Sequence, residues 1–192
     1  MKLKMLALAT VTLLLLGCKS SNTTLDDEVR KLFFNVNTKS SYDDMVKYFK
    51  SQKSLMYIKE NGYTEYPPRS DSGNKEIKHS SDYFEINTYD DIKGIKKGAL
   101  FLMRVGPHDD NITSLQMLLG FQNKTQADNA FNGFMERLKG FSIVKEDLPP
   151  FTQRRTIHDQ RNSSTNLEVL MFVDDSLKLY NVQLHTVIDA LK

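Results

Sequence analysis

Residues 113–145 read TSLQMLLGFQNKTQADNAFNGFMERLKGFSIVK, and this stretch decides the fold. Apolar residues recur at every second position of 113–122, which predicts a strand with one buried face. From Thr125 to Leu138 they recur at helical spacing, with a capping-box pattern at Thr125 and Asp128 and a stop at Gly140. A second strand at 141–145 completes a β-α-β unit, whose crossover is right-handed if its strands are parallel. The predicted buried residues are Leu115, Met117, Leu119, Phe121, Ala127, Ala130, Phe131, Phe134 and Leu138.

Two further helices are predicted before this unit. Residues 25–36 begin with acidic side chains and continue with apolar ones at helical spacing. Residues 42–60 have a broad apolar face, with a capping serine at 40–41 and an Asn-Gly stop at 61–62. The Pro-, Ser- and Gly-containing segment 63–82 predicts a long loop. This loop could be a disordered insertion or carry a recognition surface formed by Tyr63, Tyr66 and Arg69.

The rest of the chain favours strands separated by irregular segments. In order we expect a strand at 83–86, a turn or short helix at 90–98, a strand at 99–105, an irregular segment at 146–166, strands at 167–173 and 177–184 around a turn at 174–175, and a short helix at 186–191. Together these predict a single compact α+β domain. Its sheet is mostly antiparallel, with two main helices and one β-α-β unit.

The N-terminus, MKLKMLALATVTLLLLGC, has the layout of an export signal. Lys2 and Lys4 form a basic head, and an apolar run follows at 5–16. This run is shorter than the roughly 20 residues that a membrane-spanning helix needs. The leader is therefore predicted to be removed.

The end of this leader, from Leu15 through Leu16 and Gly17 to Cys18, resembles the lipobox of bacterial lipoproteins, with Leu16 bulkier than usual at its position. The resemblance implies diacylglycerol on the sulfur of Cys18, cleavage before Cys18 and acylation of the freed amine, for example with palmitate. The alternatives are an ordinary secretory signal or a free thiol. The expected organisation is a signal peptide at 1–17, a lipidated tether at 18–24 and a globular domain at 25–192.

Charge and cysteine content narrow the environment and the partners. The chain has 26 basic and 24 acidic residues, and two of the basic ones leave with the leader, so the mature body is neutral. The mature body thus has no basic surface charge that would favour nucleic-acid binding. Cys18 is the only cysteine, which leaves no disulfide for the domain. Lys19 after the cysteine favours the outer membrane, facing the periplasm, and surface exposure stays open because the acids at 26–28 come late.

Familiar catalytic and metal-binding motifs are missing from the sequence. The four histidines, at positions 79, 108, 158 and 185, lack metal-ligand spacing, so no metal is expected. There is no serine elbow, phosphate loop or dinucleotide fingerprint, so no cofactor and no catalytic residue is assigned. A triad assembled from distant residues stays open. Caps and turns explain the four adjacent acid pairs, Asp43–Asp44, Asp90–Asp91, Asp109–Asp110 and Asp174–Asp175.

The strongest local charge cluster lies in the segment 146–166. On a loop, this cluster could bind a carboxylate or phosphate through charge-assisted hydrogen bonds. Nearby acids, Glu146, Asp147 and Asp159, could neutralise it instead. The cluster consists of Arg154, Arg155, His158 and Arg161.

The central unit also resembles the first half of a sporulation-related repeat, a small ferredoxin-like module of envelope proteins. The matching positions are Leu115, Gln116, Leu119, Gly120, Phe121, Asn123, Ala127, Ala130, Phe131, Leu138, Gly140 and Phe141. The resemblance implies binding to peptidoglycan glycan strands, with Gln116 as a contact. A second half is not evident, because residues 105–107, which resemble its strand, precede the unit.

Three functions follow from these features. The favoured one is a membrane-anchored envelope lipoprotein without catalysis: a binding, assembly or immunity-like accessory protein with a protein partner. The second is a peptidoglycan-binding lipoprotein. The third is an envelope hydrolase with His158 or His185 as its base.

Overall fold

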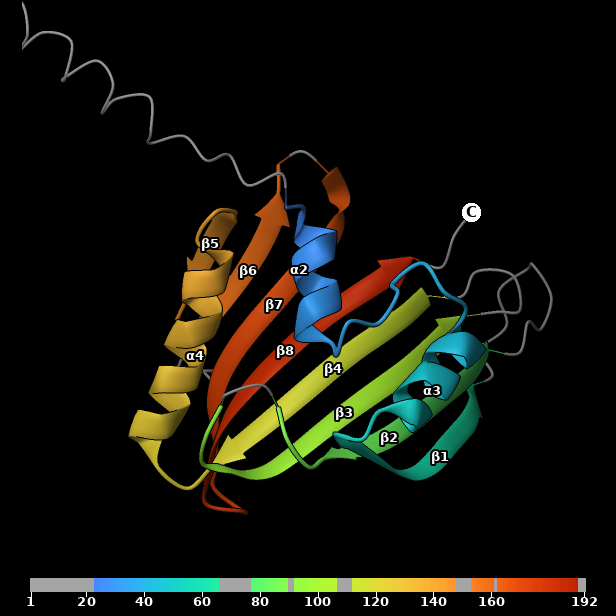
Figure 1. Cartoon of the computed structure of the whole chain (residues 1–192), viewed down its shortest axis with the longest axis horizontal. Helices are drawn as coiled ribbons and strands as arrows, with labels where there is room; N and C mark the ends of the chain where they lie inside the picture. The colour runs from blue at the N-terminus through green and yellow to red at the C-terminus, as the bar shows by residue number, and fades with distance from the viewer. Residues whose placement is uncertain are drawn as a thin grey trace, which may run out of the picture.

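The structure, a computed structural model of the chain, describes residues 23–65, 77–89, 92–106, 112–147, 153–160 and 162–189. Within them, eight strands form one antiparallel sheet in the order β1-β2-β3-β4-β8-β7-β6-β5, and three helices lie on one face of it (Figure 1). This confirms the predicted single α+β domain. The helices are α2 (Leu25–Leu32), α3 (Tyr42–Ser51) and α4 (Lys124–Leu138), and the strands are β1 (Leu55–Glu65), β2 (Ile77–Ile86), β3 (Ile95–Gly106), β4 (Ile112–Phe121), β5 (Ser142–Glu146), β6 (Gln153–Asp159), β7 (Asn162–Asp174) and β8 (Leu179–Asp189).

The predicted β-α-β unit is present as β4, α4 and β5. Its strands run in the same direction because four antiparallel steps separate them, but β8, β7 and β6 lie between. The apolar face of β4 is fully buried, and the apolar stripe of α4 packs on β4, β7 and β8. The periodicity of 113–138 therefore predicted both buried faces correctly.

The cap of α4 differs from the prediction. Asn123 precedes the helix, and its Oδ1 accepts a hydrogen bond from the Thr125 N–H at 2.8 Å. Asp128 instead pairs with Lys124 Nζ at 2.8 Å. Thr125 lies inside the first turn, so the predicted capping box is wrong and Asn123 is the N-cap.

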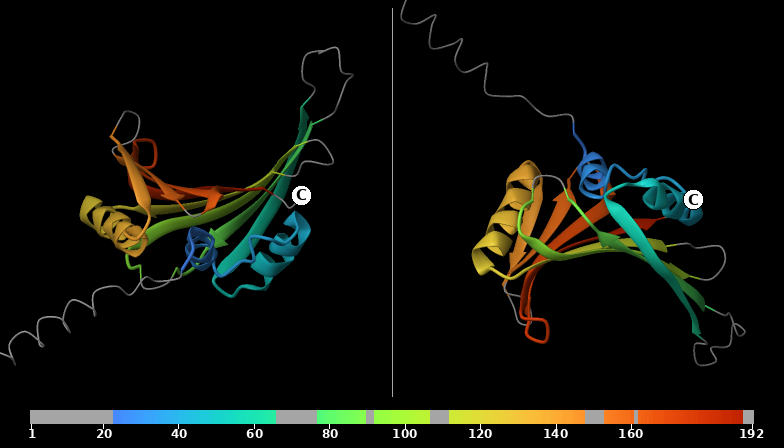
Figure 2. Two further views of the ribbon diagram at one scale, coloured as in Figure 1. Left: turned by 90° about the horizontal axis from the view of Figure 1, so that it is seen from above. Right: turned by 60° about the horizontal axis from the view of Figure 1, so that its bottom comes forward.

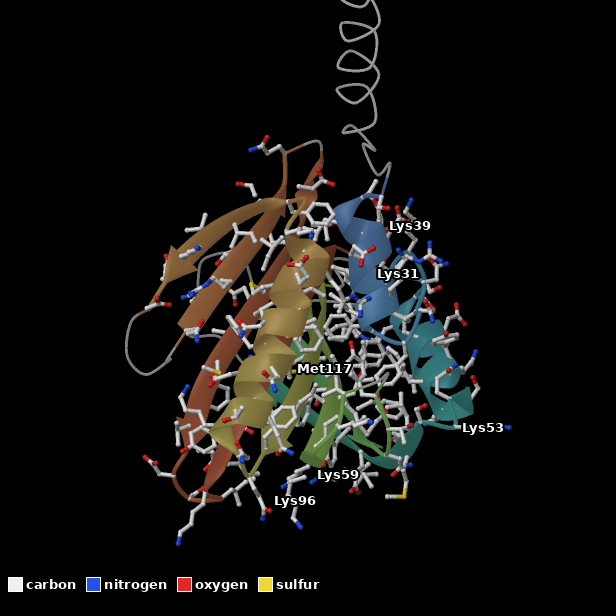
Figure 3. All side chains as sticks on the ribbon, turned by 60° about the vertical axis from the view of Figure 1, so that its left-hand side comes forward. Lys31, Lys39, Lys53, Lys59, Lys96 and Met117 are labelled. Carbon is white, nitrogen blue, oxygen red and sulfur yellow. The ribbon has the colours of Figure 1, made fainter. Side chains whose placement is uncertain are left out.

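The core lies between the sheet and the three described helices. α2 packs on β7, and α3 packs on β1 and β3. Met117, which is fully buried, lies in the interior beside α4, whereas Lys31, Lys39, Lys53, Lys59 and Lys96 point outward (Figure 3). Burial of this one apolar layer holds the fold together.

Helix α2 ends earlier than predicted because two residues after it adopt left-handed backbone conformations. The φ angles are 58° at Phe34 and 61° at Asn35, which a helix cannot continue through. Two tyrosines hold this turn: Tyr48 Oη donates to the Phe34 carbonyl at 2.7 Å, and Tyr89 Oη donates to the Leu32 carbonyl at 2.8 Å. The turn allows Phe33 and Val36 both to reach the core.

The predicted helix 42–60 is wrong in its second half. The helix ends at Ser51, and 55–65 form the edge strand β1 paired with β2. Leu55 and Tyr57 face the core, whereas Met56 is 47% exposed and Ile58 lies at a bulge and is 41% exposed. The apolar run therefore has the two-residue period of a strand with one buried face.

Four other predicted segments are also corrected. Residues 63–65 and 77–82 belong to β1 and β2, so the loop is shorter than 63–82. Residues 153–159 and 162–166 are strand because they pair in the sheet and only one face of each must be apolar. β8 continues to Asp189, where a helix was predicted, and the described part of 90–98 contains the start of β3. Tyr66, Arg69, Asp90, Asp91, Asp109, Asp110 and Arg161 lie outside the described residues, as does 1–22.

The second face of the sheet carries none of the described helices (Figure 2). Both views in Figure 2 show the helices on one side, and the β1–β2 hairpin bends away from that side. This helix-free surface is called the open face below. Side chains that alternate with the buried positions of each strand lie on it.

Candidate functional site

Five consecutive strands each contribute one polar or charged side chain to a line of contacts on the open face. Leu115 and Met117 face the core, so their neighbour Ser114 on β4 faces the other way. The same alternation exposes the other four, and the register of the sheet brings them together. The five residues are Ser114 (β4), His185 (β8), Glu168 (β7), Arg154 (β6) and Glu146 (β5), called the open-face cluster below.

The side chains of the open-face cluster form a continuous chain of contacts. Ser114 Oγ lies 2.9 Å from His185 Nε2, and His185 Nδ1 lies 3.4 Å from Glu168 Oε2. Arg154 Nη2 donates to Glu168 Oε1 at 2.5 Å, and Arg154 Nη1 lies 3.6 Å from Glu146 Oε2. Glu168 therefore uses one carboxylate oxygen for arginine and the other for histidine.

Glu168 remains ionised at neutral pH. Burial raises its pKa, but the hydrogen bonds from Arg154 and His185, together with their charges, lower it more, so the net pKa is below the ordinary 4.5. The hydrogen bond to Glu168 raises the pKa of Arg154 in turn. A carboxylate that is ionised and held on both oxygens can fix the orientation of a neighbouring imidazole.

The predicted arginine and histidine cluster is split by its strand. Arg154 lies on the open face, whereas Arg155 lies on the helical face, 5.7 Å from the ring of Phe131, and donates to Asp147 Oδ1 at 2.5 Å. His158 Nδ1 lies 2.7 Å from Asn166 Oδ1. The structure does not bring these residues into one anion site: each of the two described arginines pairs with an acid.

Gln116, the predicted glycan contact, lies on the open face between Phe101 of β3 and His185 of β8. Beyond Phe101, the ring of Tyr83 stacks on the Phe101 ring, with centroids 5.1 Å apart and an interplanar angle of 20°. Aromatic rings, an amide and the open-face cluster thus adjoin on neighbouring strands. The arrangement offers both apolar and hydrogen-bonding groups to a ligand.

Other predicted features have structural roles where they are described. Asp44 accepts a hydrogen bond from the capping residue Ser41, and Asp174 accepts the N–H groups of Ser176 and Leu177 in the β7–β8 turn. Among the described residues no group of three or more His, Cys, Asp or Glu could hold a metal ion. No described helix is long and apolar enough to cross a membrane.

Sequence reasoning named His185 and Gln116 but missed Ser114 and Glu168 as partners of His185. The only sequence signal for either is its alternation with buried neighbours, which many surface residues share. Ser114 and His185 are 71 positions apart. Their contact depends on β8 lying beside β4, and no local sequence pattern predicts that strand order.

Comparison with family models, curated proteins and solved structures returned no match to this chain.

Proposed function

We propose that this chain is a bacterial envelope lipoprotein, anchored through lipid on Cys18, that binds a protein partner through the open face of its sheet. The anchor rests on the lipobox-like end of the leader, which the described residues do not include. The binding role rests on the open face. A sheet face that carries none of the described helices, and that presents aromatic, amide and ion-paired side chains, is suited to a partner surface.

The open face has the mixed chemistry that protein interfaces use. The stacked Tyr83 and Phe101 rings supply apolar area, and Gln116 and Gln183 supply amide hydrogen-bonding groups. Because these groups extend from paired strands, binding would require little ordering of the backbone. This favours a binding, assembly or immunity-like accessory role.

The partner is tested by crosslinking and pull-down from detergent-solubilised envelope extract with the full-length protein. We expect a defined protein to be captured by the wild type and lost from a Phe101→Ala, Gln116→Ala double variant. Lys139→Ala, on the surface after α4, is the matched control and retains capture. A wild type that captures nothing, or a double variant that captures as well as the control, contradicts the proposed binding face.

The anchor is tested separately with Cys18→Ala. We expect the wild type to fractionate with membranes and to carry lipid on the Cys18 peptide in mass spectrometry, and the variant to lose both. An unmodified thiol in the wild type, or an uncut leader, contradicts lipid anchoring.

A second candidate function is peptidoglycan binding, which the position of Gln116 beside the Tyr83–Phe101 stack favours. Aromatic rings pack on the apolar faces of sugars, and amides bond to their hydroxyl and acetamido groups. Sedimentation with purified sacculi tests it. Protein that stays in the supernatant contradicts this function, and cosedimentation that Gln116→Ala and Phe101→Ala both weaken supports it.

A further inference from the structure

We propose that Ser114, His185 and Glu168 form an acyl-transfer site for small esters, with Ser114 as the nucleophile. This activity goes beyond partner binding and does not depend on it. Three strands hold these side chains, so their relative positions are set by the sheet rather than by loops. A nucleophile, a base within hydrogen-bonding reach and a third group that orients the base are the parts that covalent catalysis requires.

The hydrogen-bonding capacities of the three groups assign the protons. An ionised Glu168 can only accept, so His185 Nδ1, which faces it, carries a hydrogen. In the neutral imidazole, Nε2 is then an acceptor. Nε2 lies 2.9 Å from Ser114 Oγ, so the serine hydroxyl donates to it. His185 is therefore in the tautomer that can remove the proton of Ser114.

Arg154 is a positioning residue in this arrangement. Its bond to Glu168 Oε1 leaves Oε2 directed at His185. The distance of 3.4 Å between Nδ1 and Oε2 is long for a hydrogen bond, as such contacts often are before substrate binds. The fixed charge of Glu168 stabilises the imidazolium that forms when His185 takes the proton.

The reaction balances without a cofactor. Ser114 Oγ attacks the carbonyl carbon of the ester while its proton passes to His185 Nε2. The tetrahedral intermediate collapses, the bond from the carbonyl carbon to the leaving oxygen breaks, and that oxygen takes the proton from Nε2. Water then gives a proton to Nε2 and attacks the carbonyl carbon of the acyl-serine. The second tetrahedral intermediate collapses, the bond from the carbonyl carbon to Ser114 Oγ breaks, and Oγ takes the proton from Nε2, which releases the carboxylic acid and restores Ser114.

The surroundings of Ser114 limit the substrate to small acyl groups. Ser114 is only 8% exposed, which excludes a bulky acyl chain. The backbone N–H groups of β4 are used by β3 and β8, so the developing oxyanion must be met by a side chain. Gln116 lies two residues along β4 on the same face and opposite His185, and its amide is the donor that the proposal requires. Short-chain activated esters and phosphonylating probes meet these limits.

A fluorophosphonate probe tests the proposal on the full-length protein in detergent. Attack by Ser114 forms a phosphorus–oxygen bond and releases fluoride, and mass spectrometry of the digested protein locates the label. We expect the label on Ser114, no label in Ser114→Ala, and labelling at least about 100-fold slower in His185→Gln, the lower end of what a positioned base contributes. Release of p-nitrophenol from p-nitrophenyl acetate should fall in parallel.

Two matched variants exclude general effects on the open face. Ser142→Ala removes a serine of β5, and His158→Gln removes the histidine opposite it on β6. Both should be labelled like the wild type. A wild-type protein left without label on Ser114, or a His185→Gln variant labelled as fast as His158→Gln, overturns the proposal. Neither result bears on the protein pull-down, so the two proposals fail independently.

Discussion

At the scale of single residues, the helical side of the sheet contains a buried polar contact as well as the apolar core. Tyr42 Oη donates to Asp82 Oδ2 at 2.7 Å, and both residues are buried. Burial, and then the hydrogen bond to Asp82, raise the pKa of Tyr42 far above its ordinary value of 10. The hydroxyl therefore stays protonated and donates to Asp82 at any ordinary pH.

Removing this hydroxyl should destabilise the domain. We expect Tyr42→Phe to lower the free energy of unfolding by about 1–3 kcal/mol, because a buried carboxylate loses its donor. Urea denaturation measures the change. Tyr180→Phe, on a partly buried ring of β8, is the control and should change stability by less than about 0.5 kcal/mol. Equal stability of the two variants would show that the Tyr42 contact contributes nothing.

At the scale of helices and strands, the N-terminus of α4 allows two candidate N-cap residues to be compared directly. The structure assigns the cap to Asn123, whereas the sequence pattern predicted Thr125. Asn123→Ala should cost about 0.5–2 kcal/mol of stability. Thr125→Ala and the exposed mid-helix Asn129→Ala should cost little, since alanine favours helix. Thermal unfolding of the three variants ranks them, and a larger loss in Thr125→Ala would restore the predicted cap.

Some of the helices and strands could be predicted from sequence patterns and others could not. β4 and α4 were predictable because each had a sustained period with one apolar face. The helix predicted at 55–60 was wrong because a short apolar stretch fits a helix and a strand equally well. Pairing with β2 makes this stretch a strand. β6 was predicted as an irregular segment because its polar residues are typical of a loop. A strand with one face in solvent tolerates such residues. The contacts among Ser114, His185 and Glu168 could not be predicted because they depend on β4, β8 and β7 lying side by side.

At the scale of the whole molecule, the open-face cluster crosses the junction between the two halves of the sheet. β4 belongs to the N-terminal half, β8 to the C-terminal half, and the cluster extends from β4 to the edge strand β5. The lowered pKa of Glu168 makes this network sensitive to acid. Because the unfolded chain holds a proton on Glu168 more readily than the folded chain, stability falls as pH falls.

This acid sensitivity can be measured with Glu168→Gln. The stabilisation from ionised Glu168 is complete above its unfolded pKa, close to the ordinary 4.5, and is lost as pH falls through the lower folded value. Urea unfolding from about pH 7 to pH 3 should therefore show a shallower pH dependence in the variant than in the wild type. Glu136→Gln, at an exposed pair with Lys139, is the control and should follow the wild type. Identical slopes for Glu168→Gln and wild type would contradict the pKa shift.

Helix α2 is hydrogen-bonded to the β6–β7 hairpin, which lies far along the chain. The Leu25 N–H donates to Asp159 Oδ2 at 3.0 Å, across 134 positions of sequence, in a buried contact. During synthesis, α2 is made well before its partner, which follows most of the domain. The Leu25 N–H thus has no partner carboxylate until residue 159 has been made, so a chain that is exported as proposed would leave this contact unformed during most of its synthesis.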